Sequence, residues 1–141
     1  MANILGIDYG KKFVGYAVGN NISLSSSTYG TIFYKNQKNL FTDLKKLIDD
    51  WDIQYIVIGL PLNMDDSESE MSLFIRKLAK RIQKSLNIKC KLHDERLTTF
   101  EAKELMIENK KSSKQVISDN DGIAAKLILE SWLREKEESD V

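Results

Sequence analysis

The feature that most constrains the fold is a change in the spacing of apolar residues along the chain. Three segments with the length and composition of strands come first, at Asn3–Asp8, Phe13–Val18 and Thr28–Tyr34. After them, apolar residues recur at helical spacing in segments that alternate with two more strands, Ile53–Ile58 and Ile88–His93. This order, β-β-β-α-β-α-β-α-α, predicts an α/β fold with a mixed five-stranded sheet and helices on both faces.

The length and composition fit one domain spanning residues 1–141. The hydrophobic share of 42% and the charged share of 30% are ordinary for a globular protein with a single core. The one cysteine, Cys90, cannot form an internal disulfide, and with His93 it supplies too few ligands for a Cys/His zinc site. The N-terminus has no signal pattern and the chain has no run of 18 apolar residues, so we expect a cytoplasmic protein without membrane contact.

The charge balance bears on the class of partner. Lys plus Arg and Asp plus Glu number 21 each, so the formal net charge is zero. A protein that coats nucleic acid through bulk charge is therefore disfavoured, but an enzyme that holds one phosphate backbone in a locally basic groove is compatible with this balance.

Three carboxylates are candidates for catalysis or metal binding. Asp8 ends a buried apolar strand, Glu95 follows the fifth strand, and Asp121 opens the last predicted helix. A carboxylate inside an apolar run needs a cation, hydrogen bonds or solvent at the edge of the sheet. Each candidate also has a structural interpretation: Asp8 as a turn residue, Glu95 as part of a solvated loop, and Asp121 as the end of a capping box that begins at Ser118. Spacing alone leaves these alternatives open.

Four segments together carry a family resemblance. They are Gly6-Ile7-Asp8-Tyr9-Gly10-Lys11-Lys12, Gly59-Leu60-Pro61-Leu62, Asp94-Glu95-Arg96-Leu97-Thr98-Thr99 and Asp121-Gly122-Ile123-Ala124-Ala125. Their sequences and their order resemble the YqgF family of pre-16S ribosomal RNA nucleases, which are also described as Holliday-junction resolvase-like proteins of the ribonuclease H-like superfamily. The resemblance spans essentially the whole chain.

The resemblance implies a ribonuclease H-like fold and a function in ribosome biogenesis. The implied reaction is hydrolysis of phosphodiester bonds with Mg²⁺ or Mn²⁺, at the 5′ end of pre-16S rRNA, and the implied catalytic and metal-binding residues are Asp8, Glu95 and Asp121. Basic residues that could contact phosphate are Lys11, Lys12, Arg96, Lys110, Lys111 and Lys114. The expected partner is precursor rRNA or branched DNA, bound by a monomer or a homodimer.

The chain departs from the family pattern at three positions. Phe13 stands where the family usually has arginine, and Asp66 and Ser69 stand where it usually has glycines. The loop Asn63–Ser69 is therefore more acidic than usual. These changes bear on affinity for the substrate more than on metal binding.

Three alternative functions remain open from the sequence. One is a Holliday-junction DNA resolvase, and another is a nucleic-acid or ribosome-assembly binding module with little catalysis, whose binding would survive Asp8→Asn. The third is a phosphate-handling ATPase or sugar kinase of the actin-like class, which also begins with a strand, an Asp and a glycine turn. Such proteins hold their nucleotide between two domains, and this chain has the length of one.

Overall fold

The computed structural model describes residues 2–10, 12–22, 26–63, 65, 67–94 and 113–139, with side chains described except at 26, 27, 113–121 and 136–139. In chain order the elements within these residues are β1 (Asn3–Tyr9), β2 (Phe13–Asn20), β3 (Ser26–Phe33), α1 (Gln37–Trp51), β4 (Ile53–Leu60), α2 (Glu70–Leu86), β5 (Lys89–Asp94) and α4 (Ser113–Ser139). The predicted strands are confirmed, with ends that differ by one or two residues.

The strands form one five-stranded mixed sheet in the order β3-β2-β1-β4-β5. β1, β2 and β3 are antiparallel neighbours, whereas β4 runs parallel to β1 and β5 runs parallel to β4. The central strand is therefore β1, and the carboxyl ends of β1, β4 and β5 meet at one edge of the sheet. This arrangement confirms the predicted antiparallel meander followed by crossover units.

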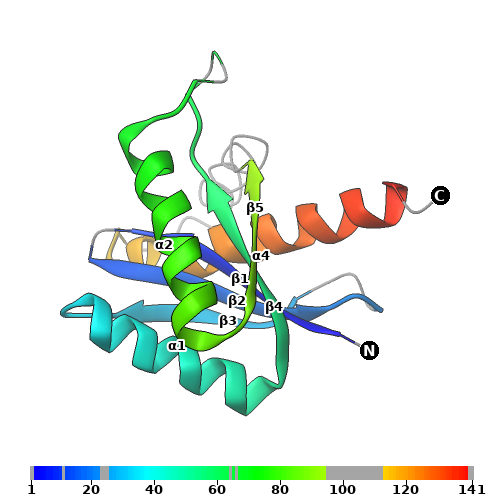
Figure 1. The fold of residues 1–141 in the computed structure, drawn as a ribbon, viewed down its shortest axis with the longest axis horizontal. Coiled ribbons are helices and arrows are strands. Elements are labelled where there is room, and N and C mark those ends of the chain that lie inside the picture. Colours follow the sequence, from blue (N-terminus) through cyan, green and yellow to red (C-terminus); the bar gives the residue numbers. More distant parts are fainter. Residues whose placement is uncertain are drawn as a thin grey trace.

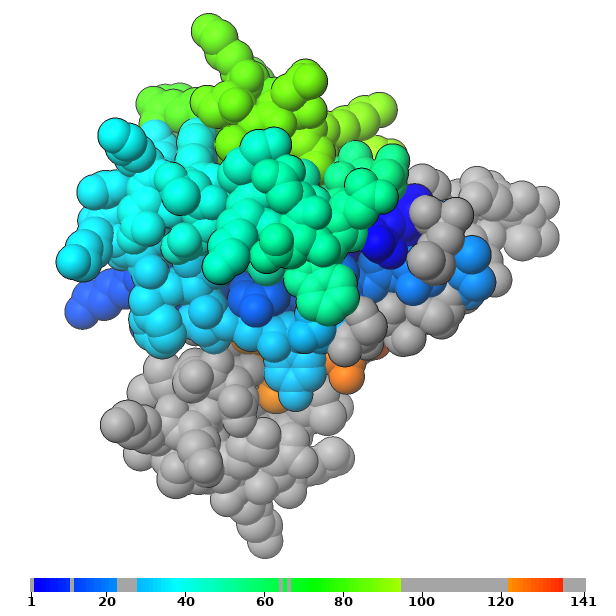
Figure 2. All heavy atoms as spheres, turned by 90° about the horizontal axis from the view of Figure 1, so that it is seen from below, coloured from blue at the N-terminus to red at the C-terminus, as the bar shows by residue number. Residues whose placement is uncertain are grey.

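Helices cover both faces of the sheet, as predicted (Figure 1). α1 and α2 lie over one face, and α4 crosses the other, where it contacts β1, β2, β3 and β4. Seen from the side, cyan and green atoms of α1 and α2 lie above the blue strands and orange atoms of α4 lie below them (Figure 2). The protein thus has three layers, with a hydrophobic cluster on each side of the sheet.

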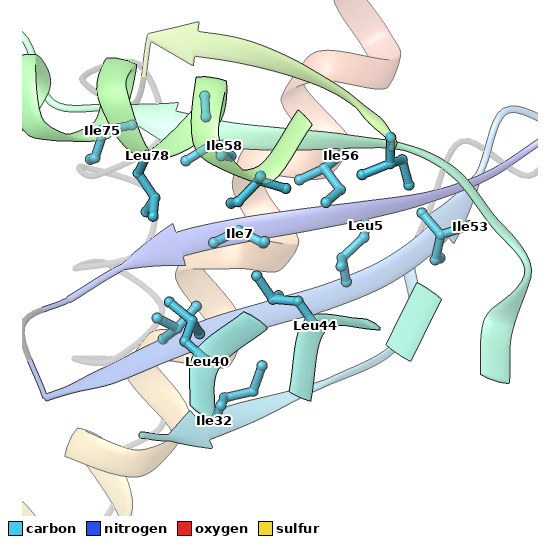
Figure 3. Packing of buried hydrophobic residues seen from close by; sticks show 14 of the residues in the cluster. Leu5, Ile7, Ile32, Leu40, Leu44, Ile53, Ile56, Ile58, Ile75 and Leu78 are labelled. Carbon is cyan, nitrogen blue, oxygen red and sulfur yellow. The ribbon is translucent and has the colours of Figure 1, made fainter. Parts of the chain in front are cut away.

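The cluster under α1 and α2 consists of large aliphatic side chains (Figure 3). Leu5 and Ile7 of β1 meet Leu40 and Leu44 of α1 there, and Ile75 of α2 packs on the same side. All five are at most 2% exposed. Because side chains alternate along a strand, Ile4, Gly6 and Asp8 are directed to the opposite face.

Ser67-Glu68-Ser69-Glu70 has the sequence of a capping box, but the start of α2 differs from that prediction. The N-cap is Ser69, whose hydroxyl accepts from the backbone N–H of Ser72, and the Ser72 hydroxyl accepts from the N–H of Ser69. Glu68 forms an ion pair with Arg76 instead. Ser69, one of the departures from the family pattern, thus has a structural role, and its hydroxyl also donates to the carbonyl of Pro61 at 2.7 Å. The departure at Asp66 lies outside the described residues.

The apolar spacing predicts that Met71, Phe74, Leu78 and Ile82 form the inward face of this helix, and the structure agrees in part. Leu78 and Ile82 are buried as expected, but Ile75 and Ala79 complete the buried face. Phe74 was predicted to lie inside and is 40% exposed.

The last helix begins earlier than predicted. α4 starts at Ser113 rather than at Asp121, so Ser118 lies inside the helix and the capping box at Ser118–Asp121 was wrong. Lys114 is likewise helical, so the basic segment 110–114 is not wholly a loop. Thr98-Thr99-Phe100-Glu101 also has the sequence of a capping box and predicts a further helix, which lies outside the described residues.

The apolar spacing predicts that Ala124, Leu127, Ile128 and either Trp132 or Leu133 face inward in the last helix, and the structure confirms Ile128 and Leu133. Ile123, Ala125 and Leu129 are buried as well, whereas Ala124 and Leu127 are half-buried. In the described part of the chain, no helix is both long enough and apolar enough to cross a membrane.

Candidate active site

Asp8 is the candidate residue whose side chain the structure places. It lies near the carboxyl end of β1, directly opposite Gly15 of β2, and is half-buried. It shares a face of the sheet with Ile4, which packs against α4, while Leu5 and Ile7 point to the other helices. The carboxylate thus sits on the central strand, on the α4 side, at the edge where β1, β4 and β5 end. In α/β sheets, ligands bind at this edge.

α4 approaches the sheet very closely beside Asp8. A Cβ atom on Gly6 would lie 2.8 Å from the Leu129 Cβ and 3.1 Å from the Ala125 carbonyl oxygen. A Cβ atom on Gly122 would lie 2.7 Å from the Tyr29 ring and 3.3 Å from the backbone nitrogen of Gly30. Glycine at these two positions therefore lets α4 cross β1 and β3 in direct backbone contact.

For the other two predicted carboxylates, the structure describes the adjacent residues but not the side chains themselves. Asp121 immediately precedes Gly122 within α4, but its side chain lies outside the described residues. Glu95 also lies outside them and follows Asp94, the last residue of β5. Among the described side chains, no group of three His, Cys, Asp or Glu residues could hold a metal ion. The meeting of Asp8, Glu95 and Asp121 therefore stays a prediction.

Lys12 is the predicted phosphate-contacting residue whose side chain is described. It is exposed in the turn between β1 and β2. The Tyr34 hydroxyl donates to the carbonyl of Gly10 at 2.6 Å and fixes this turn. Of the other candidates, Lys11, Arg96, Lys110 and Lys111 lie outside the described residues, as does the side chain of Lys114.

A polar contact between β5 and α4 was not identified from the sequence. His93 is 5% exposed, and its Nε2 lies 2.9 Å from the Ser131 hydroxyl, while its Nδ1 lies 3.5 Å from a carboxylate oxygen of Glu135. The ring also meets Trp132 edge-on. Burial lowers the pKa of His93, and the charges of Glu135 and Asp94 oppose this shift. His93 thus ties the strand that precedes Glu95 to the helix that carries Asp121.

Cys90 takes no part in this site. It belongs to β5 but packs against the cluster under α1 and α2, on the face opposite His93. Burial raises the pKa of the Cys90 thiol to about 12. The thiol therefore stays protonated at neutral pH and is a poor nucleophile.

Comparison with known proteins identifies relatives across the whole chain. A protein from Pseudomonas putida is 42% identical over 131 residues, which cover 92% of this chain and 93% of the relative. One from Saccharophagus degradans is 37% identical over 132 residues, covering 94% and 93%. Both bear the name "Putative pre-16S rRNA nuclease".

Solved structures support the fold. Thermus thermophilus RuvC in complex with a Holliday junction substrate has a TM-score of 0.59 at 8% identity, covering 97% of this chain and 96% of that one. The fowlpox virus resolvase in complex with Holliday junction DNA has a TM-score of 0.57 at 12% identity, covering 94% and 97%. At these identities the likeness concerns the fold, and it confirms the ribonuclease H-like mixed sheet.

The RuvX family model, described as Holliday junction resolvase, matches residues 2–135. Together with relatives near 40% identity, this match confirms the resemblance to YqgF proteins that the four segments indicated. It also favours a nuclease over the actin-like ATPase or kinase. The chain belongs to the RuvX family.

Proposed function

We propose that this protein is a nuclease that depends on a divalent metal ion and trims the 5′ end of pre-16S rRNA. The observation that carries the proposal is the position of Asp8: half-buried on the central strand, at the edge where β1, β4 and β5 end, and beside α4. The names of the relatives support the choice of substrate.

The chemistry of the donor set fits Mg²⁺ or Mn²⁺. All three candidates are carboxylates, and oxygen ligands are those that these ions prefer. They come from three separate elements or their ends, since Asp8 lies on β1, Glu95 follows β5 and Asp121 belongs to α4. In this proposal Asp8, Glu95 and Asp121 would together hold the metal.

A bound divalent ion would supply activation of water and stabilisation of the leaving oxygen. The chain's own residues hold the substrate. Lys12 is exposed on the turn that follows Asp8 and contacts a phosphate of the bound strand. Arg96 follows Glu95 and gives a second, bidentate phosphate contact. We assign weaker phosphate contacts to Lys11, Lys110, Lys111 and Lys114.

A second candidate substrate is branched DNA. The family description and the two structural neighbours name Holliday junctions, and this supports a test of junction DNA beside RNA. The two substrates predict different oligomeric states, because a four-way junction is cut symmetrically by a pair of active sites. Cleavage by a homodimer would therefore favour junction DNA, and cleavage by a monomer would favour an RNA end.

The decisive experiment compares wild type with Asp8→Asn on a precursor 16S rRNA fragment and on a four-way DNA junction, with Mg²⁺ or Mn²⁺ and then with EDTA. We expect RNA cleavage that EDTA abolishes. The substitution should lower the rate by more than about 100-fold, the upper range for loss of a residue that only supports a metal ligand.

Asp50→Asn is the matched control, because Asp50 is exposed on α1, on the other side of the sheet, and the substitution removes the same charge. Its rate should equal that of wild type. Metal-dependent cleavage that survives Asp8→Asn would contradict the proposed site. RNA binding without any cleavage by wild type would identify the chain as a binding module.

A further inference from the structure

Two phenylalanines, half-buried Phe13 and exposed Phe33, form an aromatic pair at the end of the sheet where Asp8 lies. Phe13 is the first residue of β2 and Phe33 is the last residue of β3, and the two are directly paired across the strands. Their ring centroids are 5.7 Å apart at an interplanar angle of 63°, an edge-on contact. Phe33 is nevertheless 67% exposed. The contact between the two rings therefore leaves most of Phe33 open to solvent.

The register places this pair on the same face as Asp8. Asp8 is opposite Gly15, and Phe13 lies two residues from Gly15 on the same strand, so Asp8 and Phe13 are diagonal neighbours. Such neighbours are about 7–8 Å apart. The intervening Val14 and Ile32 point to the opposite face, into the cluster under α1 and α2. One nucleotide can therefore reach both Asp8 and the aromatic pair.

A basic residue directly precedes Phe13 in the chain. Lys12 immediately precedes Phe13 and is exposed, and the turn that carries it is held by the hydrogen bond from Tyr34 to Gly10. A cation next to exposed aromatic rings is the combination that proteins use to bind single-stranded nucleic acid, in which the cation meets the backbone and the rings stack on bases.

We propose that Phe13 and Phe33 form a stacking platform for an unpaired base of the RNA next to the scissile phosphate. This inference rests on the proposed function, since it takes Asp8 as the point where the strand is held. Bases inside a duplex have both faces covered by their neighbours, so a ring platform selects nucleotides that are unpaired or frayed. The protein would therefore recognise a single-stranded segment beside the bond that it cuts.

The test measures stacking directly, in the Asp8→Asn background so that the RNA stays intact. The probes are a short single-stranded RNA that contains 2-aminopurine and the same strand annealed as a blunt duplex. Stacking on an aromatic ring quenches 2-aminopurine fluorescence. Phe33→Ala should abolish the quenching and weaken single-strand binding by roughly fivefold or more, the effect of losing one base–aromatic stack. Duplex affinity should not change.

Two further variants distinguish a loss of stacking from a general loss of structure. Phe33→Trp keeps an aromatic ring and should retain the quenching. Trp51→Ala removes another exposed aromatic ring, 40% exposed, at the opposite end of the sheet, where the Asn3 side chain donates to the Trp51 carbonyl. It should leave both readouts unchanged. Thermal unfolding of each variant confirms that it is folded.

Several outcomes would overturn the inference. One is quenching and affinity that persist in Phe33→Ala, and another is an equal loss of affinity for single strand and duplex. A third is a dimer that becomes monomeric in Phe33→Ala with RNA affinity unchanged, which would make the pair a contact between two copies of the chain. A failure of the proposed function looks different: wild type would quench the probe but cleave neither RNA nor junction DNA.

Discussion

The two faces of the sheet are built in different ways. Under α1 and α2, the buried residues are nearly all large and aliphatic, such as Leu5, Leu44 and Ile56 (Figure 3). Under α4, the cluster is smaller and includes Ala17 and Ala125, and Gly6 lies against the helix without a side chain. The α4 face also holds the buried pair His93 and Ser131, and Asp8 lies at its end.

The face under α1 and α2 thus mainly stabilises the fold, whereas the α4 face also positions the candidate site. Aliphatic burial stabilises the fold roughly in proportion to its area, and it tolerates small shifts of the helices. The α4 face instead uses small residues to bring a helix backbone against the central strand, and this fixes the distance between Asp8 and the segment that carries Asp121. We therefore expect substitutions on the first face to change stability alone, and those on the second to change stability and cleavage together.

The largest effect on stability is expected from Leu44→Ala. Leu44 is 1% exposed in α1 and its truncation leaves a cavity in the larger cluster. The free energy of unfolding should fall by about 2–5 kcal/mol. Denaturant unfolding measures this loss, and the cleavage rate per folded molecule should stay that of wild type. A loss of cleavage at a temperature where the variant is folded would contradict the expectation that this face affects stability alone.

Gly6→Ala should have a smaller effect on stability but a clear effect on cleavage. The added Cβ would lie 2.8 Å from the Leu129 Cβ, so α4 has to move away from β1. Such overpacking lowers the free energy of unfolding by about 1–3 kcal/mol. The displaced helix also carries Asp121, so kcat should fall even in the folded fraction. Unfolding curves combined with single-turnover cleavage would sharpen the contrast with Leu44→Ala, and unchanged kcat would argue against a role for the close contact.

Ser131→Ala should have the smallest effect. It removes the hydroxyl 2.9 Å from the Nε2 atom of buried His93, and the net contribution of such a hydrogen bond is about 1 kcal/mol. The melting temperature and the metal concentration that gives half-maximal cleavage should both change slightly, because β5 and α4 are less firmly joined. Glu135→Gln is the comparison on the same helix. It alters the exposed contact of His93, and glutamine has about the same size as glutamate. An equal effect from both variants would show that burial of the contact is unimportant.

Much of the fold could be predicted from local patterns. The strand runs and the helical spacing after them identify the five strands and the two crossover units, because periodicity reports which faces are buried. The start of α4 was predicted wrongly because tertiary packing outweighs the local sequence there. Ser118 to Asp121 has the composition of a cap, and Gly122 lowers helix propensity, but the packing of Gly122 against Gly30 of β3 favours a continuous helix there.

The candidate site was predictable only in part. An acidic residue at the end of an apolar strand marks Asp8, and the structure places it at the edge of the sheet where ligands bind. The partners of His93 could not be predicted, because Ser131 and Glu135 are about forty residues away in the chain. The pairing of Phe13 with exposed Phe33 also depends on strand register, which single residues do not reveal.

The path of α4 has a consequence for biosynthesis. The helix runs from Gly122, which packs on β3, to Ser131, which contacts β5, so it spans the sheet from one outer strand to the other. It also follows the other described elements in the chain. The first face can close on α1 and α2 before α4 has been synthesised, but the second stays open to water and to chaperones until α4 has emerged and packed. In our proposal the metal site needs Asp121 of α4, so a nascent chain that still lacks this helix would have no assembled centre with which to cut RNA.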